Sequence, residues 1–257
     1  MEKNFFEWVM FFFQSNWQQF LLGTATTLLV SLSGTIIGFF LGLGVSLIQY
    51  TKTDDKSSTL FKGFIKFLKI LISIYITIFR GTPMIVQAMV IFYGLPQLIG
   101  LNLDPLPAAL LIVSINTGAY MAEMIRGGVD SVDPGQLEGA QAIGMSHFQA
   151  MISIIFPQAV RNVLPSIGNE FIINIKDTSV LNVIGVTELF FTSKSIAGSY
   201  AKYYEVFIIT SVIYLFLTFT ISLILNAIEK KIDGPKNFEI LPLQDGNNVV
   251  IKKGEGV

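Results

Sequence analysis

Long runs without a single charged side chain constrain this chain more than any other feature. Residues 8–51 contain no aspartate, glutamate, lysine or arginine, and neither do residues 206–228. About 20 consecutive apolar residues are enough for a helix to cross the hydrocarbon core of a bilayer. Two further uncharged stretches, 81–103 and 105–122, are separated only by Asp104, which stands beside a proline and indicates a turn. The chain is therefore expected to be an integral membrane protein.

The composition supports this interpretation and excludes several classes of function. Of the 257 residues, 52% are hydrophobic and 14% are charged, and the formal net charge is −1. A chain without a basic cluster on a soluble face is not expected to bind nucleic acid. There is no cysteine and only one histidine, His147, so we expect no disulfide, no metal site and no cofactor. The first uncharged run is too long for a cleavable signal, so its helix should be retained.

Charge gaps and turn residues predict an all-α fold with about five transmembrane helices. The expected spans are residues 18–50, 83–101, 105–126, 162–185 and 204–228. Residues 1–17 should form an extracytoplasmic or interfacial segment before the transmembrane domain, 18–228, and residues 229–257 should form a polar cytoplasmic tail. Small residues in the first span suggest close packing on a neighbouring helix, with a flexible lipid-facing helix as the alternative. They are Gly34, Gly38, Gly42 and Gly44.

The distribution of basic residues predicts the orientation in the membrane. Eleven lysines and arginines fall on one side of the expected spans and three on the other. The first group is Lys52, Lys56, Lys62, Lys66, Lys69, Arg80, Arg126, Arg161, Lys230, Lys231 and Lys236, and the second is Lys3, Lys194 and Lys202. Because cytoplasmic loops carry the excess of positive charge, the amino terminus should lie outside and the carboxyl terminus in the cytoplasm. Lys62, Lys66 and Lys69 stand among phenylalanines at helical spacing, which predicts an interfacial amphipathic helix leading into the second span.

The segment between the third and fourth spans, residues 126–170, is too long for a hairpin connection. Asp133 followed by Pro134 is a helix-start signal, and Gly144 is expected to end the short helix that follows. Ser146 can cap a second short helix over residues 147–156. Two short helices on the cytoplasmic face would form a rigid knob that a partner protein can push.

This loop resembles a known docking motif. Glu138, Gly139 and Ala140, followed by Gly144 and later by Pro157, are similar to the EAA loop of ABC importer permeases. The family pattern has alanine at the position of Gly139 and leucine at the position of residue 156, which is phenylalanine here. Neither departure removes a charge or the turn glycine.

The resemblance extends well beyond the loop. Residues 79–87, 116–129, 157–172 and 176–186 look like the polar amino acid permeases, the subfamily for substrates of the histidine, glutamine, glutamate and arginine type. Together with the loop, these segments cover about residues 20–228, nearly the whole expected membrane body.

The resemblance implies the type I ABC importer permease fold in a bacterial cell membrane. It implies ABC ATPase subunits, a second permease subunit, identical or homologous, and an extracytoplasmic binding protein that delivers a polar amino acid. Glu138, Gly139, Ala140, Gly144 and Pro157 would couple the chain to the ATPase. The chain contains no GxxxxGK[ST] sequence, so ATP hydrolysis is expected from the partner, and this chain is not expected to be an enzyme.

Polar residues inside the expected spans are candidates for a substrate path, because an ionisable group in a span is costly unless it faces a cavity or a partner. The candidates are Asn116, Tyr120 and Glu123 in the third span, and Glu170, Lys176, Asp177, Thr178 and Ser179 in the fourth. We expect residues 176–179 to be a polar, partly unwound segment, and mutual neutralisation of Lys176 and Asp177 is the alternative. For Glu123 the alternative is an exposed i, i+3 pair with Arg126.

Two other functions are compatible with the residues alone. An ion-coupled secondary transporter would use Glu170, Lys176 and Asp177 as a relay, although five spans without an internal repeat argue against it. A membrane scaffold that transports nothing would use the loop only to recruit a soluble partner. Uptake driven by an ion gradient in the absence of an ATPase would distinguish the secondary transporter from the ABC permease.

Overall fold

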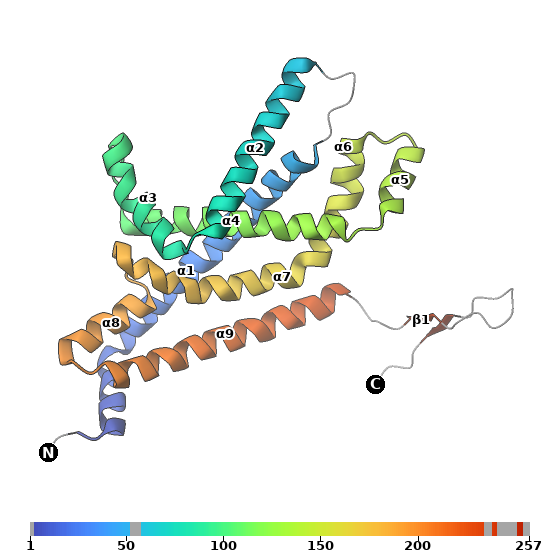
Figure 1. The fold of residues 1–257 in the computed structure, drawn as a ribbon. Coiled ribbons are helices and arrows are strands. Elements are labelled where there is room, and N and C mark those ends of the chain that lie inside the picture. The colour runs from blue at the N-terminus through green and yellow to red at the C-terminus, as the bar shows by residue number, and fades with distance from the viewer. Residues whose placement is uncertain (1–2, 52–57, 234–237, 241–250, 254–257) are drawn as a thin grey trace.

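The computed structural model describes residues 3–51, 58–233, 238–240 and 251–253, and it shows an elongated bundle of helices (Figure 1). The α-helices are α1 (Phe5–Tyr50), α2 (Thr59–Gly81), α3 (Met84–Ile99), α4 (Pro105–Asp130), α5 (Pro134–Ala142), α6 (His147–Ala150), α7 (Phe156–Asp177), α8 (Leu189–Tyr200) and α9 (Tyr203–Asp233). A π-helix, Met151–Ile155, joins α6 to α7, and a 3-10 helix, Thr178–Ile184, follows α7. The prediction of an all-α membrane body is confirmed.

Beyond α9 the described chain contains two short strands in the expected tail. β1 (Phe238–Ile240) and β2 (Ile251–Lys253) pair antiparallel, with Phe238 opposite Lys253. Lys52, Lys56 and Lys236, which contributed to the predicted charge bias, lie outside the described residues.

Four helical segments are long and apolar enough to cross a membrane: Phe5–Tyr50, Pro105–Asp130, His147–Ile184 and Tyr203–Lys231. The shorter α3 is also apolar and corresponds to the span expected at 83–101. Two expected boundaries were wrong. Helix α1 begins at Phe5 and not at residue 18, because Asn4 and Glu7 form a capping box. The helical segment that contains the fourth span begins at His147 and not at residue 162, because α6 continues through the π-helix into α7.

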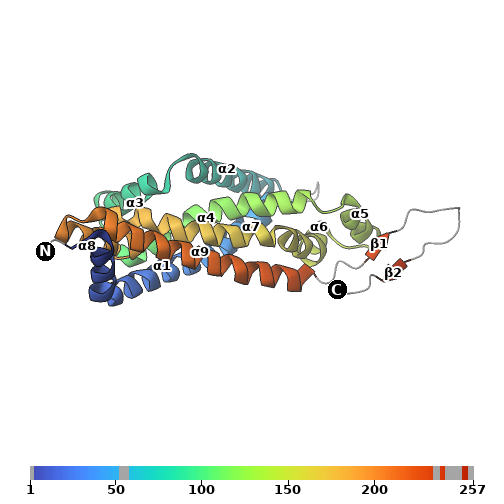
Figure 2. The same ribbon diagram turned by 90° about the horizontal axis from the view of Figure 1, so that it is seen from below.

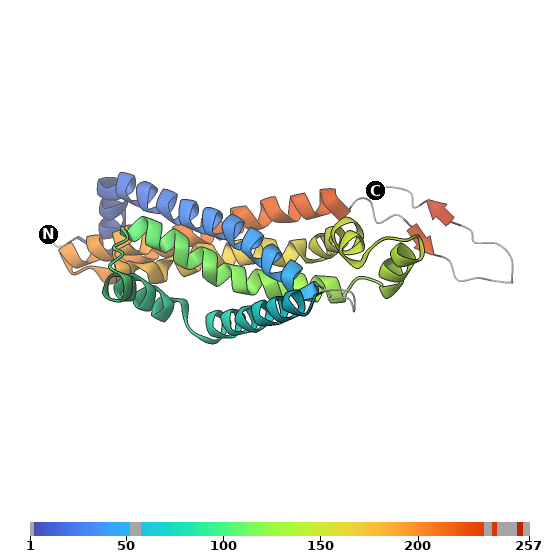
Figure 3. The same cartoon turned by 90° about the horizontal axis from the view of Figure 1, so that it is seen from above.

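Helix α4 lies at the centre of the bundle, in contact with α1, α2, α3 and α7. Figures 2 and 3 show α2 and α3 along one side of the bundle and α9 along the opposite side. They also place α5 and α6 at one end of the bundle and α8, with the amino terminus, at the other.

Close packing of α1 on α4 depends on glycine. A Cβ atom on Gly34 would lie 2.4 Å from Val113 Cγ1, and one on Gly42 would lie 2.5 Å from Met121 Cβ. Gly38 meets α4 between these two points, at Thr117. The predicted close packing is confirmed at these three glycines, whereas Gly44 has open space where a Cβ would stand.

Buried polar side chains also tie the central helices together. Asn174 of α7 donates to Thr35 Oγ1 of α1 at 2.8 Å and exchanges hydrogen bonds with Thr117 of α4 at 3.0 and 3.2 Å. All three side chains are buried, so their polar groups have no access to water. In a membrane such groups stabilise a helix bundle only when they find one another, as they do here.

At the α8 end, one buried carboxylate joins three helices. Glu188 is fully buried and caps α8 by accepting hydrogen bonds from the backbone N–H groups of Phe190 at 2.8 Å and Phe191 at 2.6 Å. The same carboxylate accepts from the Tyr214 hydroxyl of α9 at 3.1 Å and from Thr27 of α1 at 3.5 Å. The helix amino terminus and two hydroxyls together balance this buried charge.

Candidate functional site

Helix α5 is a separate short helix with a defined start and end. The Asp133 side chain accepts from the Gly135 backbone N–H at 2.7 Å, and Pro134 occupies the first turn. At the other end Gly144 has a φ of 88° and donates to the Gln141 carbonyl, while Met145 donates to the Ala140 carbonyl. This pair of bonds is the Schellman motif, which needs a left-handed residue at the position of Gly144. The predicted start and end of this helix are confirmed.

The second loop helix differs from the separate short helix expected over 147–156. Ser146 does cap α6, in a capping box with Gln149. The chain then passes through the π-helix and continues into α7 without a loop. Figure 1 shows α6 at a steep angle to α7, and a π-helix is a common site for such a bend. We call α5 and α6 together the loop knob; its second helix is a bent extension of the fourth span.

One side of α5 holds the loop knob to the bundle and the other faces outward. Leu137 packs against a buried cluster that includes Met151 and Ile155 of the π-helix, and Ala140 is also buried. Glu138 and Gly139 are exposed. The resemblance assigns Glu138, Gly139 and Ala140 to coupling. Glu138 and Gly139 are available to a partner protein, and Ala140 is not.

Two large apolar side chains stand out on the loop knob. Ile143 is 79% exposed and Phe148 is 61% exposed, and they flank the turn at Gly144. Apolar side chains exposed next to a helix turn are typical of a surface that another protein covers. Neither side chain was predicted to be functional, because an apolar residue in a loop carries no signal until its exposure is known.

Pro157 and Phe156 mark the start of α7. Pro157 is exposed in the first turn, where its missing N–H is not needed. Phe156 is 5% exposed, and its ring centre lies 6.2 Å from that of Tyr50. The phenylalanine that departs from the family pattern is therefore a buried contact between α7 and α1, and it does not change the outward surface.

Tyr50, at the end of α1, connects the loop knob to two helices. Its hydroxyl donates to Asp130 Oδ1 of α4 at 2.7 Å and lies 3.2 Å from the Arg126 carbonyl oxygen. Its own carbonyl lies 3.1 Å from His147 Nε2 of α6. Because a carbonyl only accepts, this ring nitrogen carries the proton. His147 was not expected to have a chemical role, and no sequence pattern pointed to Tyr50.

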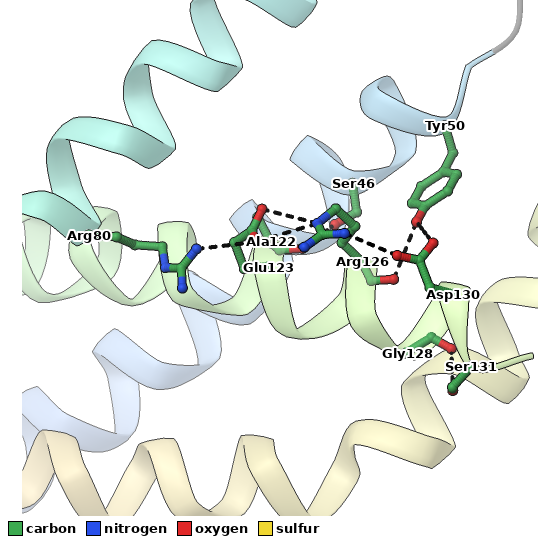
Figure 4. A network of polar contacts seen from close by, with 9 residues as sticks. All are labelled: Ser46, Tyr50, Arg80, Ala122, Glu123, Arg126, Gly128, Asp130 and Ser131. Carbon is green, nitrogen blue, oxygen red and sulfur yellow. Dashed lines mark hydrogen bonds and ion pairs between the residues drawn. The ribbon is translucent and has the colours of Figure 1, made fainter.

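A row of charged side chains runs along α4 toward the loop knob (Figure 4). Glu123 Oε2 lies 3.1 Å from Arg80 Nη1 of α2 and 3.1 Å from Arg126 Nη2 of its own helix. Arg126 Nη1 lies 3.0 Å from Asp130 Oδ2. The i, i+3 pair that was the alternative for Glu123 is present, and Arg80 joins it from another helix. Arg80 lies in the last turn of α2, so it is a helix residue and not part of a loop between two spans.

The Arg80–Glu123 pair lies within a candidate membrane span, away from the end of α4. Glu123 precedes the end of α4, Asp130, by seven residues, which is about 10 Å at 1.5 Å per residue. The side chains of Arg80 and Glu123 are 42% and 23% exposed. The Arg80 guanidinium also stands 5.7 Å from the ring centre of Tyr120. Partly exposed charges inside a span indicate a water-filled path or a covering protein.

Asn116, the remaining candidate on α4, helps to satisfy backbone carbonyls where the chain breaks between α2 and α3. It is 8% exposed and donates to Gln87 Oε1 at 2.9 Å. Gln87 Nε2 in turn lies 2.9 Å from the carbonyl oxygens of both Phe79 and Thr82. These carbonyls lose their helical partners where α2 ends, so the two amides replace the missing hydrogen bonds. Neither this role nor Gln87 followed from the sequence pattern.

The candidates of the fourth span lie where α7 ends. Lys176 and Asp177 are exposed in the last turn of α7, and Thr178, which is buried, starts the 3-10 helix. The backbone therefore departs from α geometry at the predicted position. Ser179 accepts a hydrogen bond from Asn182 at its carbonyl. Glu170 is 5% exposed, and its carboxylate has no hydrogen-bond partner among the described residues.

The two groups of path candidates do not meet in the part of the chain that the structure describes. Asn116, Tyr120 and Glu123 contact α2 and α3, whereas Glu170 to Ser179 belong to α7 and the 3-10 helix. Among the described residues there is also no group of three or more potential metal ligands of the His, Cys, Asp or Glu type.

The fold and the loop knob define a class of membrane transport protein, and comparison with known families agrees. Residues 60–234 match the family described as binding-protein-dependent transport system inner membrane component, and this chain belongs to that family. It is therefore a permease subunit. Family membership supports the ABC permease hypothesis and not the ion-coupled carrier.

Among curated proteins, this chain is similar to the arginine transport system permease protein ArtQ of Bacillus subtilis (strain 168). The two are 35% identical over 210 residues, which cover 82% of this chain and 90% of ArtQ. It is 37% identical over 210 residues to the glutamine transport system permease protein GlnP of Escherichia coli (strain K12), covering 81% of this chain and 90% of GlnP.

Solved structures show the same relationship. An amino acid ABC transporter crystallised with histidines has a chain that superposes with a TM-score of 0.76 and 35% identity, covering 90% of this chain and 100% of that one. A chain of the MetNI methionine ABC transporter, in an inward-facing conformation, superposes with a TM-score of 0.67 at 17% identity, covering 84% of this chain and 96% of that one. At that identity the second comparison shows the fold alone.

Proposed function

We propose that this chain forms one half of the membrane path of an ABC importer for a polar amino acid. Its partners are a second permease subunit, a pair of ABC ATPase subunits and an extracytoplasmic binding protein. The observation that carries the proposal is the loop knob, in which α5 presents Glu138 outward and packs through Leu137 against the bent extension of a membrane span. The named functions of ArtQ and GlnP support an amino acid as the substrate.

Coupling follows from how the loop knob is attached. Helix α5 rests on the π-helix through Leu137, and α6 contacts the end of α1 through His147 and Tyr50. Movement of a docked ATPase would therefore displace the ends of α1 and α7 together. Such a rigid-body displacement can alternate the path between outward and inward access.

The charged face of α4 is the part of the path that we assign to the ends of the substrate. An amino acid carries a carboxylate and an ammonium group, which Arg80 and Glu123 can bind by exchanging their mutual ion pair for the substrate. Tyr120 lines the same face. Lys176, Asp177, Thr178 and Ser179, with Glu170, form a second polar stretch of the path at the end of α7.

Uptake measurements test the class of transporter. Membrane vesicles that contain this permease, its partner subunits and the binding protein should accumulate a radiolabelled amino acid only when ATP is supplied. Uptake that persists without the ATPase subunits, driven by a proton or sodium gradient, would overturn the proposal.

Glu138→Ala tests the coupling role of the loop knob. Because Glu138 is exposed, its loss should leave the unfolding midpoint unchanged while uptake falls at least tenfold. Gln136→Ala, which changes an exposed position on another side of α5, is the matched control and should transport normally. Equal uptake by the two variants would contradict docking through Glu138.

Glu123→Gln tests the charged face. Loss of one charged hydrogen bond to the substrate, worth roughly 1.5–3 kcal/mol, should raise the KM for uptake by about tenfold or more with little change in the maximal rate. Asp130→Asn, at the exposed end of the same row, is the control. A fall in the maximal rate at unchanged KM would mean that Glu123 does not bind the substrate.

A further inference from the structure

The hydroxyl of Tyr50 joins two parts of the chain that the proposed function uses separately. Tyr50 is the last residue of α1, and its hydroxyl donates to Asp130 Oδ1 of α4 at 2.7 Å. Asp130 Oδ2 lies 3.0 Å from Arg126 Nη1, and Arg126 Nη2 lies 3.1 Å from Glu123 Oε2. An unbroken series of polar contacts therefore leads from the end of α1 to the charged face that we assign to the substrate (Figure 4).

The other contacts of Tyr50 are with the segment that carries the loop knob. Its carbonyl accepts a hydrogen bond from His147 Nε2 at 3.1 Å, and its ring meets that of Phe156 edge to face, with ring centres 6.2 Å apart. His147 is the first residue of α6, and Phe156 is the first residue of α7. Tyr50 therefore contacts the bent extension of the fourth span both at its start and where it joins α7. A displacement of this extension relative to α1 will act on Tyr50.

The junction between α1 and the loop knob leaves room for such a displacement. A cavity of about 130 Å³ lies there, and Tyr50, His147 and Phe148 are among the residues that line it. The buried Nδ1 of His147 has no hydrogen-bond partner among the described residues, so the bond to the Tyr50 carbonyl is the polar contact that the ring makes in this part of the chain. Because protein interiors are otherwise close-packed, a void of this size allows α6 to shift against α1 without overlap.

Arg126 stands between two carboxylates and can divide its hydrogen bonds between them in more than one way. Its Nη1 faces Asp130, whereas its Nε and Nη2 face Glu123, which also pairs with Arg80 of α2 at 3.1 Å. The Tyr50 hydroxyl donates to Asp130 and stabilises part of its negative charge. When that bond is broken, Asp130 attracts Arg126 more strongly and draws the guanidinium away from Glu123. The partners of Glu123 therefore depend on the position of Tyr50.

Holding α1 against α4 does not explain this network. The side chains of Arg126 and Asp130 are 48% and 56% exposed, and ion pairs in contact with water add little stability. The close packing of α1 on α4 is already provided by Gly34, Gly38 and Gly42. The contacts of Tyr50 and Arg126 are therefore better suited to positioning side chains than to stabilising the bundle.

We propose that Tyr50 is a positioning residue that couples the loop knob to the substrate-binding face of α4. This inference rests on the proposed function, in which an ATPase subunit moves the loop knob. When the loop knob moves, the Tyr50 hydroxyl leaves Asp130, Arg126 turns toward Asp130, and the Glu123 carboxylate becomes available to the ammonium group of the substrate. Return of the loop knob restores the Arg126–Glu123 pair, which displaces the substrate. Each cycle of ATP hydrolysis is thereby tied to binding and release of one amino acid.

Tyr50→Phe tests the proposal in the assembled transporter. Phenylalanine keeps the ring next to Phe156 and the carbonyl that faces His147, and only the hydroxyl is lost. Proteoliposomes that contain this permease, its partner subunits and the binding protein receive ATP and radiolabelled arginine or glutamine, and uptake and ATP hydrolysis are measured together. Residues of a coupling network change coupling by a factor of about 2 to 30, so the number of amino acids imported per ATP should fall about threefold or more. The KM for uptake should not rise, because Tyr50 does not touch the substrate.

Asp130→Asn keeps the proposal testable if Tyr50→Phe disturbs the fold. This variant removes the charge through which Tyr50 acts on Arg126. It should leave the KM unchanged, since Asp130 does not touch the substrate either, and it should lower the number of amino acids imported per ATP as Tyr50→Phe does. Because Tyr50 acts through Asp130, the double variant should lose no more than the more affected single variant.

Tyr214→Phe is the matched control. Tyr214 also donates its hydroxyl to a carboxylate, that of Glu188 at 3.1 Å, but it does so near α8, at the opposite end of the bundle from the loop knob. Because Glu188 is fully buried, this variant should lower the unfolding midpoint. The number of amino acids imported per ATP should stay the same. The comparison separates the position of Tyr50 from the general effect of losing a tyrosine hydroxyl.

Three outcomes would overturn the proposal. They are an unchanged number of amino acids imported per ATP in Tyr50→Phe, losses that add up in the double variant, and an equal loss in Tyr214→Phe. Failure of the proposed function would look different, because the unmodified transporter would then import the amino acid without ATP.

Discussion

Gly42 shows how much of this bundle depends on single residues. A Cβ atom there would lie 2.5 Å from Met121 Cβ and 2.8 Å from the Ala122 nitrogen, closer than atoms pack without a shift of the backbone. Gly44, two residues on, has nothing within 4 Å of the same position. The sequence presents these two glycines as equivalent, and only the contact with α4 separates them.

We expect Gly42→Ala to destabilise the chain by about 1–3 kcal/mol, because the added methyl group overpacks the α1–α4 contact. Gly44→Ala should be neutral or stabilising, since alanine favours a helix over glycine by about 1 kcal/mol. Thermal unfolding of the purified variants in detergent measures both. Equal midpoints would mean that α1 does not pack on α4 in this way.

Asn174 is the second residue on which the core depends. Asn174→Ala removes its hydrogen bonds with Thr35 and Thr117 and leaves two buried hydroxyls with fewer partners, which we expect to cost about 1–2 kcal/mol. Asn169→Ala changes an exposed amide on the same helix and is the control. A loss of stability confined to Asn174→Ala in the same unfolding measurement is the expected result.

At the scale of the elements, the loop knob and the α2–α3 break are two irregular features that differ in how far the sequence predicted them. The first was predictable, because Asp133, Pro134, Gly144 and Ser146 act on their own neighbours through backbone hydrogen bonds. The second was not, because Gln87 and Asn116 satisfy carbonyls on a different helix. Local capping chemistry is readable in a sequence, whereas a hydrogen bond between helices depends on how they are placed.

Gly144→Ala tests the geometry of the loop knob. A left-handed conformation costs a residue with a Cβ about 1–2 kcal/mol, so the turn between α5 and α6 should loosen. Amide hydrogen exchange should become faster over residues 134–147 and stay the same in α4. Gly139→Ala, which adds a methyl group in open space within α5, should slow exchange in the same segment. Unchanged exchange in Gly144→Ala would contradict the Schellman turn.

At the scale of the whole molecule, the direction of the chain through the membrane determines which end of the bundle faces the cytoplasm. The loop knob and the end of α9 lie at one end of the bundle, and α8 and the amino terminus lie at the other (Figure 2). The excess of lysine and arginine at the loop-knob end predicts that this end is cytoplasmic.

The absence of cysteine from the chain makes this orientation directly measurable. Single replacements at exposed positions, Ser199→Cys in α8 and Gln141→Cys in α5, place one thiol at each end. A membrane-impermeant maleimide should label Ser199→Cys in intact cells and Gln141→Cys only after the membrane is opened. The reverse pattern would invert the topology.

Uncharged runs, capping signals and the spacing of the loop residues determined that this chain crosses a membrane and that α5 forms a short helix with a defined start and end. These features depend on short-range chemistry and on the cost of burying charge in lipid. Both effects are determined by residues that are consecutive in the sequence. The tertiary structure alone decided that Arg80 pairs with Glu123, that Asn174 joins three helices and that the second loop helix continues into α7. Each of these contacts depends on how segments that are far apart in the chain pack against one another. A local sequence pattern does not predict that packing.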